Sequence, residues 1–199
     1  MAPGLGSLPM SRVEPESIDL GALASRPIVL CGFMGVGKTS IGKRLARRLR
    51  RPFFDLDELI VSKLGASVPD LFSSGNEPLF RDTESAILRD LVLCDPSSVI
   101  ALGGGAYDNA GSREFLHEHA FVIHLDQSWQ ALYPALNRLR ESRPLLTSRS
   151  NAEIEALYYQ RRAIYLLADL TVAIPRAGVA RATREVVRAL LTYVNSTTN

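Results

Sequence analysis

The sequence predicts a three-layer α/β protein, in which helices cover both faces of a parallel sheet. Two observations support this: five short apolar segments of strand length recur along the chain, and helical periodicities separate them. Strands that are apolar at consecutive positions are typical of a parallel sheet buried on both faces. The expected strands are 27–31, 52–56, 98–102, 120–125 and 169–174, and the expected helices are 38–50, 82–93, 112–119, 128–140, 152–168 and 178–194.

The length and composition limit the class of protein. A chain of 199 residues suits one domain with an inserted lid. Residues 1–25 are rich in Gly, Pro and Ser, so we expect a flexible extension there and a single domain over 26–195. No apolar run approaches the roughly 18 residues of a membrane helix, and the N-terminus lacks a signal-peptide pattern. Two cysteines, Cys31 and Cys94, are too few for a disulfide framework, so we expect buried free thiols. These features predict a cytoplasmic protein that binds no membrane, and we expect a monomer.

The charge gives little support to nucleic-acid binding. The net charge is +2, and the most basic stretch is residues 43–51. We interpret this run as the solvated face of a helix, because Ile41, Leu45 and Leu49 recur every four residues beside it. A nucleic-acid surface usually carries more basic residues or interleaved aromatics, so we expect no such partner.

A glycine-rich segment follows the first expected strand. Residues 32–39 read GFMGVGKT and match G-x-x-x-x-G-K-[ST] at every fixed position, with an amphipathic helix after them. Glycines let backbone N–H groups turn toward phosphate oxygens, and the helix N-terminus adds its positive dipole end. Lys38 is expected to reach the β- and γ-phosphates, and Thr39 to offer its hydroxyl to Mg²⁺. The segment therefore predicts nucleotide binding; the alternative is a chance glycine turn.

Two carboxylates end the second expected strand. Asp55 and Asp57 lie at the carboxyl end of this strand, the edge where ligands bind in open α/β sheets. One of them could hold a metal through water, and the other could accept a hydrogen bond from a substrate hydroxyl. The alternative is structural, because Asp57 is also a good N-cap for a helix running from Glu58.

Two further segments suggest a small-molecule pocket. Arg81 and Glu84 are three residues apart on an expected helix, which allows either an exposed ion pair or an arginine aimed at a substrate carboxylate. Three consecutive glycines, Gly103, Gly104 and Gly105, end the third expected strand and would let a ligand lie against bare backbone. The alternative for the glycines is a plain loop.

Arginines near the C-terminal third complete the set. Arg143 precedes a proline, which disfavours helix at that position, so it is either a mobile arginine on a flap over the γ-phosphate or part of a surface loop. Arg161 and Arg162 lie on an expected helix, where either could be an ordinary solvated charge.

Taken in order, these segments resemble the shikimate kinase family. The residues that carry the resemblance are GFMGVGKTSIGKRLARRL, FFDLDELI, NEPLFRDTE, GGG, RPLL and RRAIYLLAD, which span roughly 27–190. The resemblance implies a five-stranded parallel sheet in the order 2-3-1-4-5, with a mobile lid over about 139–153. It also implies that the ATP γ-phosphoryl group is transferred to the 3-hydroxyl of shikimate, with Mg²⁺ as cofactor.

The resemblance also implies roles for particular residues. Asp57 resembles the aspartate that binds the reacting hydroxyl, and Asp55, with Thr39, the magnesium site reached through water. Arg81 and Arg162 resemble the pair that grips the shikimate carboxylate, with Glu84 supporting Arg81. The remaining expected contacts are Gly103, Gly104 and Gly105 with shikimate, and Gly35, Val36, Gly37, Lys38, Thr39, Ser40, Arg143 and Arg176 with ATP.

The sequence departs from the family at two places. Asn76-Glu77 stands where Gly-Glu is usual, and Asn tolerates the left-handed backbone that a glycine adopts. Leu136 stands where an arginine is often found, so Arg138, Arg140 or Arg176 could contact adenine instead. Alternative readings are a relative acting on another polyol, such as gluconate or an aminoshikimate, and a non-enzymatic ligand sensor.

Overall fold

A computed structural model of the chain describes residues 18–139, 146 and 149–197. Its centre is a five-stranded sheet in the order β2-β3-β1-β4-β5, with every neighbouring pair parallel. The predicted strand order is confirmed. The strands are β1 (Ile28–Cys31), β2 (Phe53–Asp55), β3 (Val99–Ala101), β4 (Phe121–Asp126) and β5 (Leu170–Ala173).

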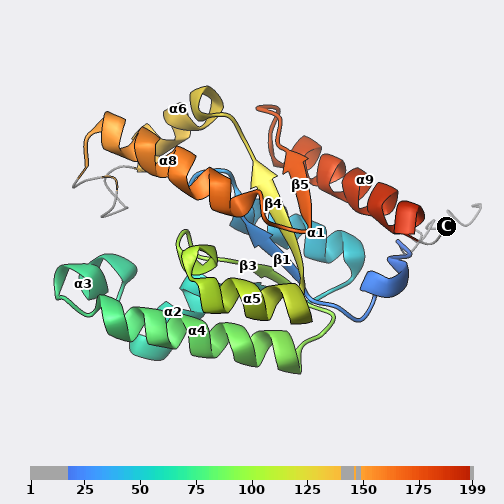
Figure 1. Cartoon of the computed structure of the whole chain (residues 1–199), viewed down its shortest axis with the longest axis horizontal. Coiled ribbons are helices and arrows are strands. Elements are labelled where there is room, and N and C mark those ends of the chain that lie inside the picture. The colour runs from blue at the N-terminus through green and yellow to red at the C-terminus, as the bar shows by residue number, and fades with distance from the viewer. Residues whose placement is uncertain (1–17, 140–145, 147–148, 198–199) are drawn as a thin grey trace, which may run out of the picture.

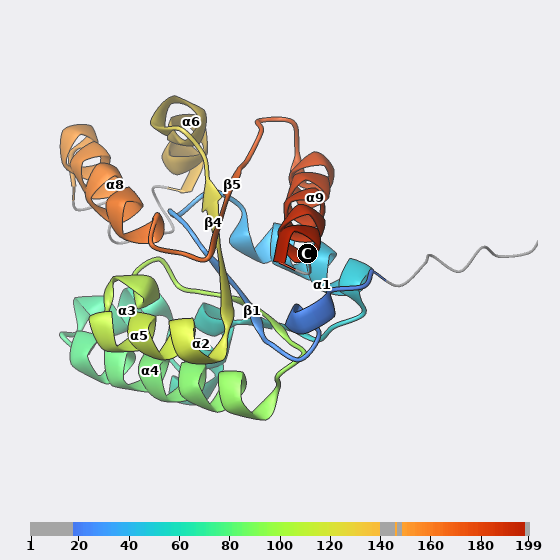
Figure 2. The same cartoon turned by 45° about the vertical axis from the view of Figure 1, so that its right-hand side comes forward.

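Helices cover both faces of this sheet, as predicted. Figure 2 shows α1 and α9 on one side of β4 and β5, and α4, α5 and α8 on the other; Figure 1 gives a second view of the same layers. The helices are α1 (Lys38–Leu49), α2 (Leu56–Leu64), α3 (Val68–Ser73), α4 (Glu77–Cys94), α5 (Ala110–His119), α6 (Trp129–Leu139), α8 (Asn151–Tyr165) and α9 (Val179–Thr197). Two short 3₁₀ helices, η1 (Gly21–Leu23) and η2 (Ala106–Asp108), complete the set within the described residues.

Local sequence explains where several helices begin. Asp55 ends β2 and caps α2, because its side chain accepts hydrogen bonds from the backbone N–H groups of Asp57 and Glu58. This differs from the expectation that Asp57 caps a helix from Glu58. Asn109 caps α5, and Ser150 forms a reciprocal capping box with Glu153 at the start of α8.

The basic run on α1 is mostly solvent-exposed, as predicted, while Ile41 and Leu45 are buried. Arg51, at its end, has a structural role. Its guanidinium donates hydrogen bonds to the carbonyl oxygens of Leu23, Ala24 and Arg26 at 2.6–2.8 Å. These contacts hold the chain before β1 against the domain.

The folded domain starts earlier than expected. Residues 18–25, which we assigned to the flexible extension, include η1 and bury Leu20 and Leu23 in the core. The rest of that extension, residues 1–17, lies outside the described residues. Both cysteines are free, but only Cys31 is buried; Cys94 is exposed at the end of α4, contrary to expectation. Within the described residues, no helix has the length and apolar character needed to cross a membrane.

Candidate active site

The glycine-rich loop joins β1 to α1 and has the backbone that its glycines predict. Gly32, Gly35 and Gly37 have φ angles of 140°, 83° and 96°, which L side chains rarely adopt. A Cβ on Gly32 would lie 2.7 Å from the carbonyl oxygen of Leu125, so a larger residue could not fit there. Lys38 arches over the loop and donates hydrogen bonds from Nζ to the carbonyls of Gly32 (2.7 Å) and Phe33 (3.3 Å).

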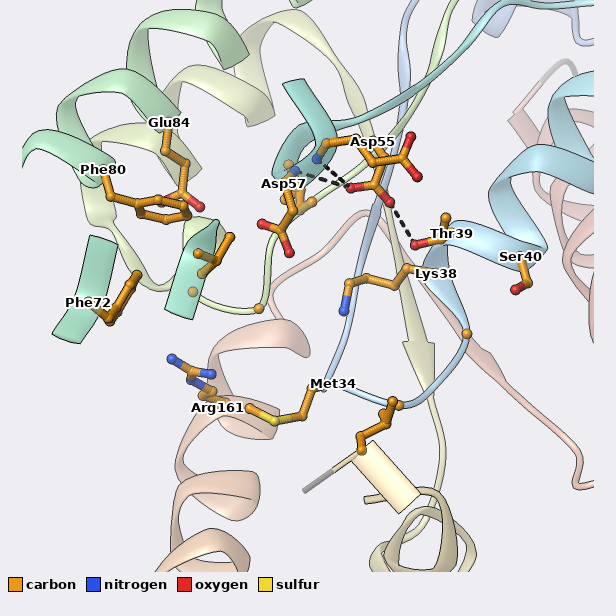
Figure 3. A pocket seen from close by; sticks show the side chains of 18 of the residues that line it. Met34, Lys38, Thr39, Ser40, Asp55, Asp57, Phe72, Phe80, Glu84 and Arg161 are labelled. Carbon is orange, nitrogen blue, oxygen red and sulfur yellow. Dashed lines mark hydrogen bonds between the residues drawn. The ribbon is translucent and has the colours of Figure 1, made fainter. Parts of the chain in front are cut away.

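The first hydroxyl of α1 meets the carboxylate that ends β2. Thr39 Oγ1 donates a 2.6 Å hydrogen bond to Asp55 Oδ2 (Figure 3). The other oxygen of Asp55 accepts from the backbone N–H groups of Asp57 (3.1 Å) and Glu58 (3.3 Å). Asp55 therefore links the first turn of α1 to the start of α2. A hydroxyl beside a carboxylate is a hard oxygen donor pair of the kind that Mg²⁺ prefers.

Asp57 projects from the first turn of α2 into the cavity beside Lys38 (Figure 3). Gly103, at the end of β3, leaves space for this side chain. A Cβ on Gly103 would lie 2.4 Å from Asp57 Oδ1 and 3.0 Å from Glu84 Oε1. The first glycine of the run therefore lets two carboxylates approach the carboxyl end of β3.

Arg81 and Glu84 form an ion pair that faces the cavity from α4. Nη1 of Arg81 lies 2.8 Å from Oε2 of Glu84, whose side chain is buried, while the contact to exposed Glu77 is longer, at 3.4 Å. Burial raises the pKa of Glu84, and the neighbouring Arg81 partly offsets that effect. The Arg81 guanidinium also lies over the rings of Phe72 and Phe80, with centroid distances of 5.6 and 5.3 Å. Packing and charge together hold Arg81 in place.

The structure places Arg161, not Arg162, in this cavity. Arg161 is buried and its Nη1 lies against Gly104, 3.7 Å from where a Cβ would stand. Arg162 turns away and forms a bidentate pair with Asp126, with Nε–Oδ1 at 2.9 Å and Nη2–Oδ2 at 2.7 Å. Our assignment of Arg162 beside Arg81 therefore differs from the structure by one residue. The two arginines diverge because consecutive helical residues point about 100° apart.

The spacing of apolar residues along α8 indicates that Arg161 faces inward. Ile154, Tyr158 and Tyr165 are buried on α8, and Arg161 lies on the same face, three to four residues from its neighbours. The pattern of buried positions therefore identifies Arg161 as the inward-facing arginine, whereas the resemblance to the family led us to Arg162.

These groups line one continuous cavity of about 420 Å³. Its lining includes the glycine-rich loop, Asp55 and Asp57, Gly104 and Gly105 after β3, and Arg81 and Arg161. Figure 3 labels Lys38, Asp57 and Arg161 among these residues. Phe72, Phe80 and Leu102 supply apolar surface that the sequence reasoning did not assign. The described residues contain no group of three or more His, Cys, Asp or Glu side chains that could hold a metal ion.

Other predicted ATP-site residues are distributed differently. Gly35, Gly37, Lys38, Thr39 and Ser40 line the cavity, and Val36 is buried beneath it. Arg176 is exposed and lines a separate groove with Arg162 and Asp126. Arg143 and most of the predicted lid lie outside the described residues.

Leu136 has a contact of its own. A Cβ on Gly35 would lie 3.4 Å from Leu136 Cδ2 and 3.6 Å from both Ala135 Cβ and Leu139 Cδ1. The apolar last turns of α6 therefore pack on the glycine-rich loop, at the position where an arginine was expected from the family.

This parallel sheet, with its glycine-rich loop and adjoining polar cavity, defines a P-loop kinase of a small molecule. Residues 34–192 match the shikimate kinase family. The chain is 40% identical over 140 residues to the shikimate kinase of Bacillus subtilis (strain 168), covering 70% of this chain and 75% of that protein. It is 41% identical over 161 residues to that of Nitrobacter winogradskyi, covering 80% and 74%. The structure of Acinetobacter baumannii shikimate kinase in complex with shikimate has a TM-score of 0.74 and 32% identity, covering 90% and 98% of the two chains. The chain belongs to the shikimate kinase family.

Proposed function

We propose that this chain transfers the γ-phosphoryl group of ATP to the 3-hydroxyl of shikimate, giving ADP and shikimate 3-phosphate. One observation carries the proposal: Lys38 of the glycine-rich loop, Asp57, Arg81 and Arg161 line the same cavity. A phosphate-binding loop at one end and paired guanidinium groups at the other suit a phosphoryl donor and a carboxylate-bearing acceptor.

The roles of the residues follow from this arrangement. Backbone N–H groups of the loop and Lys38 bind the phosphates of ATP. Asp57 accepts a hydrogen bond from the reacting hydroxyl and orients it toward the γ-phosphorus. Arg81 and Arg161 bind the acceptor carboxylate, Glu84 holds Arg81, and Gly103, Gly104 and Gly105 let the acceptor ring lie against the backbone.

Thr39 and Asp55 would hold Mg²⁺, with Asp55 acting through water, because their oxygens form a suitable hard donor pair. When held there, Mg²⁺ would supply positive charge that offsets the negative charge developing on the phosphoryl oxygens during transfer. Arg143 is proposed to add positive charge over the γ-phosphate, and Arg176 to contact the nucleotide from the loop after β5. We also propose that the protein acts as a cytoplasmic monomer.

Coupled-enzyme measurement of ADP release tests the proposal. The assay uses Mg-ATP with shikimate or with gluconate, on the wild type and on Asp57→Asn. We expect turnover that requires shikimate and collapses in the variant. Turnover with gluconate alone would reassign the acceptor, and absence of shikimate-dependent turnover in protein that binds ATP would refute the assignment.

A further inference from the structure

Two guanidinium groups converge at the far end of the cavity. A Cβ on Gly105 would lie 3.0 Å from both Nη atoms of Arg81 and 3.3 Å from Nη2 of Arg161. Like charges this close repel each other, and burial weakens the screening by water. Such an arrangement needs a separate counter-charge for each arginine.

Each arginine has its own carboxylate. Arg81 pairs with Glu84 on α4, as described above. Arg161 pairs with Asp108, whose Oδ2 lies 2.8 Å from Nε of the guanidinium. The Arg161 side chain is 8% exposed and that of Asp108 is 29% exposed, so this ion pair is largely withdrawn from solvent.

Asp108 is itself held by its surroundings. It ends η2, the short helix that follows the glycine run, and its backbone N–H donates to the Gly105 carbonyl at 3.1 Å. Arg113 of α5 donates to the backbone carbonyls of Tyr107 (3.1 Å) and Asp108 (3.3 Å). These hydrogen bonds hold the backbone of Asp108 in place, directly after the glycines that line the cavity.

The pairing leaves part of Arg161 available. Nε lies 2.8 Å from Asp108 Oδ2 in the ion pair, but neither Nε nor the buried Nη1 beside Gly104 has a hydrogen-bond partner among the described residues. Buried donors without partners are costly, and Arg161 lines the cavity with Nη2 beside Gly105, so its guanidinium is placed to receive a ligand oxygen.

We propose that Asp108 is a positioning residue for the acceptor: its ion pair fixes Arg161 so that the Nη edge of the guanidinium faces the substrate carboxylate. This inference rests on the proposed function. Asp108 does not touch the substrate and acts only through Arg161. The negative charge of Asp108 also repels the substrate carboxylate through space, which would weaken binding. We expect positioning to dominate, because without Asp108 the uncompensated Arg161 would turn away from Arg81.

The test compares Asp108→Asn and Asp108→Ala with the wild type. We expect KM for shikimate to rise about tenfold or more, because misplacing a group by about 1 Å can cost up to about 100-fold, while KM for ATP stays within about twofold. Shikimate binding followed by titration calorimetry should weaken by the same factor. A lower kcat with both KM values unchanged would show only a loss of folded enzyme and would overturn the proposal.

The substrate offers an independent check. The methyl ester of shikimate lacks the negative charge that Arg161 is proposed to grip. The wild type should prefer shikimate over the ester, and the Asp108 variants should lose most of this preference. A merely structural role of Asp108 would lower activity on both compounds equally and keep the preference.

Asp126→Asn is the matched control, because it removes the carboxylate from the neighbouring Arg162 pair on the same helix. It should lower thermal stability and leave KM for shikimate within about twofold. Unchanged or tighter shikimate binding in the Asp108 variants would overturn the proposal. Wild-type protein that neither binds nor phosphorylates shikimate would overturn the proposed function and this inference together, so the two failures are distinguishable.

Discussion

Thr39 and Asp55 are joined by a 2.6 Å hydrogen bond that connects the first turn of α1 to the N-cap of α2. The same carboxylate caps α2 through two backbone N–H groups. One side chain therefore has two separable roles, a structural one through the cap and an electrostatic one through its charge.

Substitutions at Asp55 should separate these roles. Asn is as good an N-cap as Asp, so Asp55→Asn should retain stability but require more Mg²⁺ for half-maximal activity. Asp55→Ala should show the same metal defect and also lose about 1 kcal/mol of stability. Urea denaturation and Mg²⁺ titration of turnover measure the two effects. A normal Mg²⁺ requirement in Asp55→Asn would exclude Asp55 from the metal site.

Gly103→Ala should impair activity more than folding. The added methyl group would lie 2.4 Å from Asp57 Oδ1, so the aspartate must move. A shift of about 1 Å can cost on the order of 100-fold in kcat/KM. Gly111→Ala is a suitable control, because its methyl would meet only an ordinary contact of 3.5 Å and its helix favours Ala. Equal activity in the two variants would contradict the proposed position of Asp57.

The two adjacent arginines of α8 should respond differently to the same substitution. Arg161→Lys should raise KM for shikimate about tenfold or more, because lysine cannot reproduce the planar fork. Arg162→Lys should lose about 1 kcal/mol of stability, since it breaks the bidentate pair with Asp126, and should leave KM nearly unchanged. Steady-state kinetics and thermal denaturation of both variants provide the comparison. A KM effect confined to Arg162→Lys would restore our original assignment.

His124 should make stability depend on pH. Burial on β4 lowers the pKa of this imidazole from 6.5 to about 4, opposed by Asp126 and assisted by Arg162 and Lys38. The unfolded chain therefore binds a proton that the folded protein excludes between these two values. Stability should fall as pH drops from about 6.5 to about 4, by on the order of 3 kcal/mol from this group.

Denaturation curves between pH 7.5 and 4.5 test the effect of His124. The relevant quantity is the difference in pH slope between the wild type and His124→Gln, because other groups titrate in both proteins. His119→Gln serves as a control on α5. Parallel slopes in all three proteins would rule out His124 as the cause.

Much of the fold was predictable because it depends on local patterns. Continuous apolar strands and the match at residues 32–39 identified the parallel sheet and the loop before α1. The strand order, by contrast, came from resemblance to the family. Helix α3 was not predicted and α2 was considered only as an alternative running from Glu58, because these short segments carry weak periodicity and depend on the caps at Asp55 and Ser67.

Parts of the site depended on contacts that the sequence does not display. Arg51 and the buried Leu20 and Leu23 draw residues 18–25 into the domain, although their composition resembles a loose tail. Asp108 follows a glycine run with no recognisable motif, and its importance appears only when η2 brings it to Arg161. Long-range pairing of this kind is invisible to local sequence analysis.

The divergent arginines of α8 have a mechanical consequence. Arg161 is tied to Asp108 in the loop after β3, and Arg162 to Asp126 at the end of β4. A roll of α8 about its own axis would have to break both ties together, because they leave the helix about 100° apart. The two ion pairs therefore oppose rotation of α8 and keep Arg161 turned toward the cavity and Arg162 turned away from it.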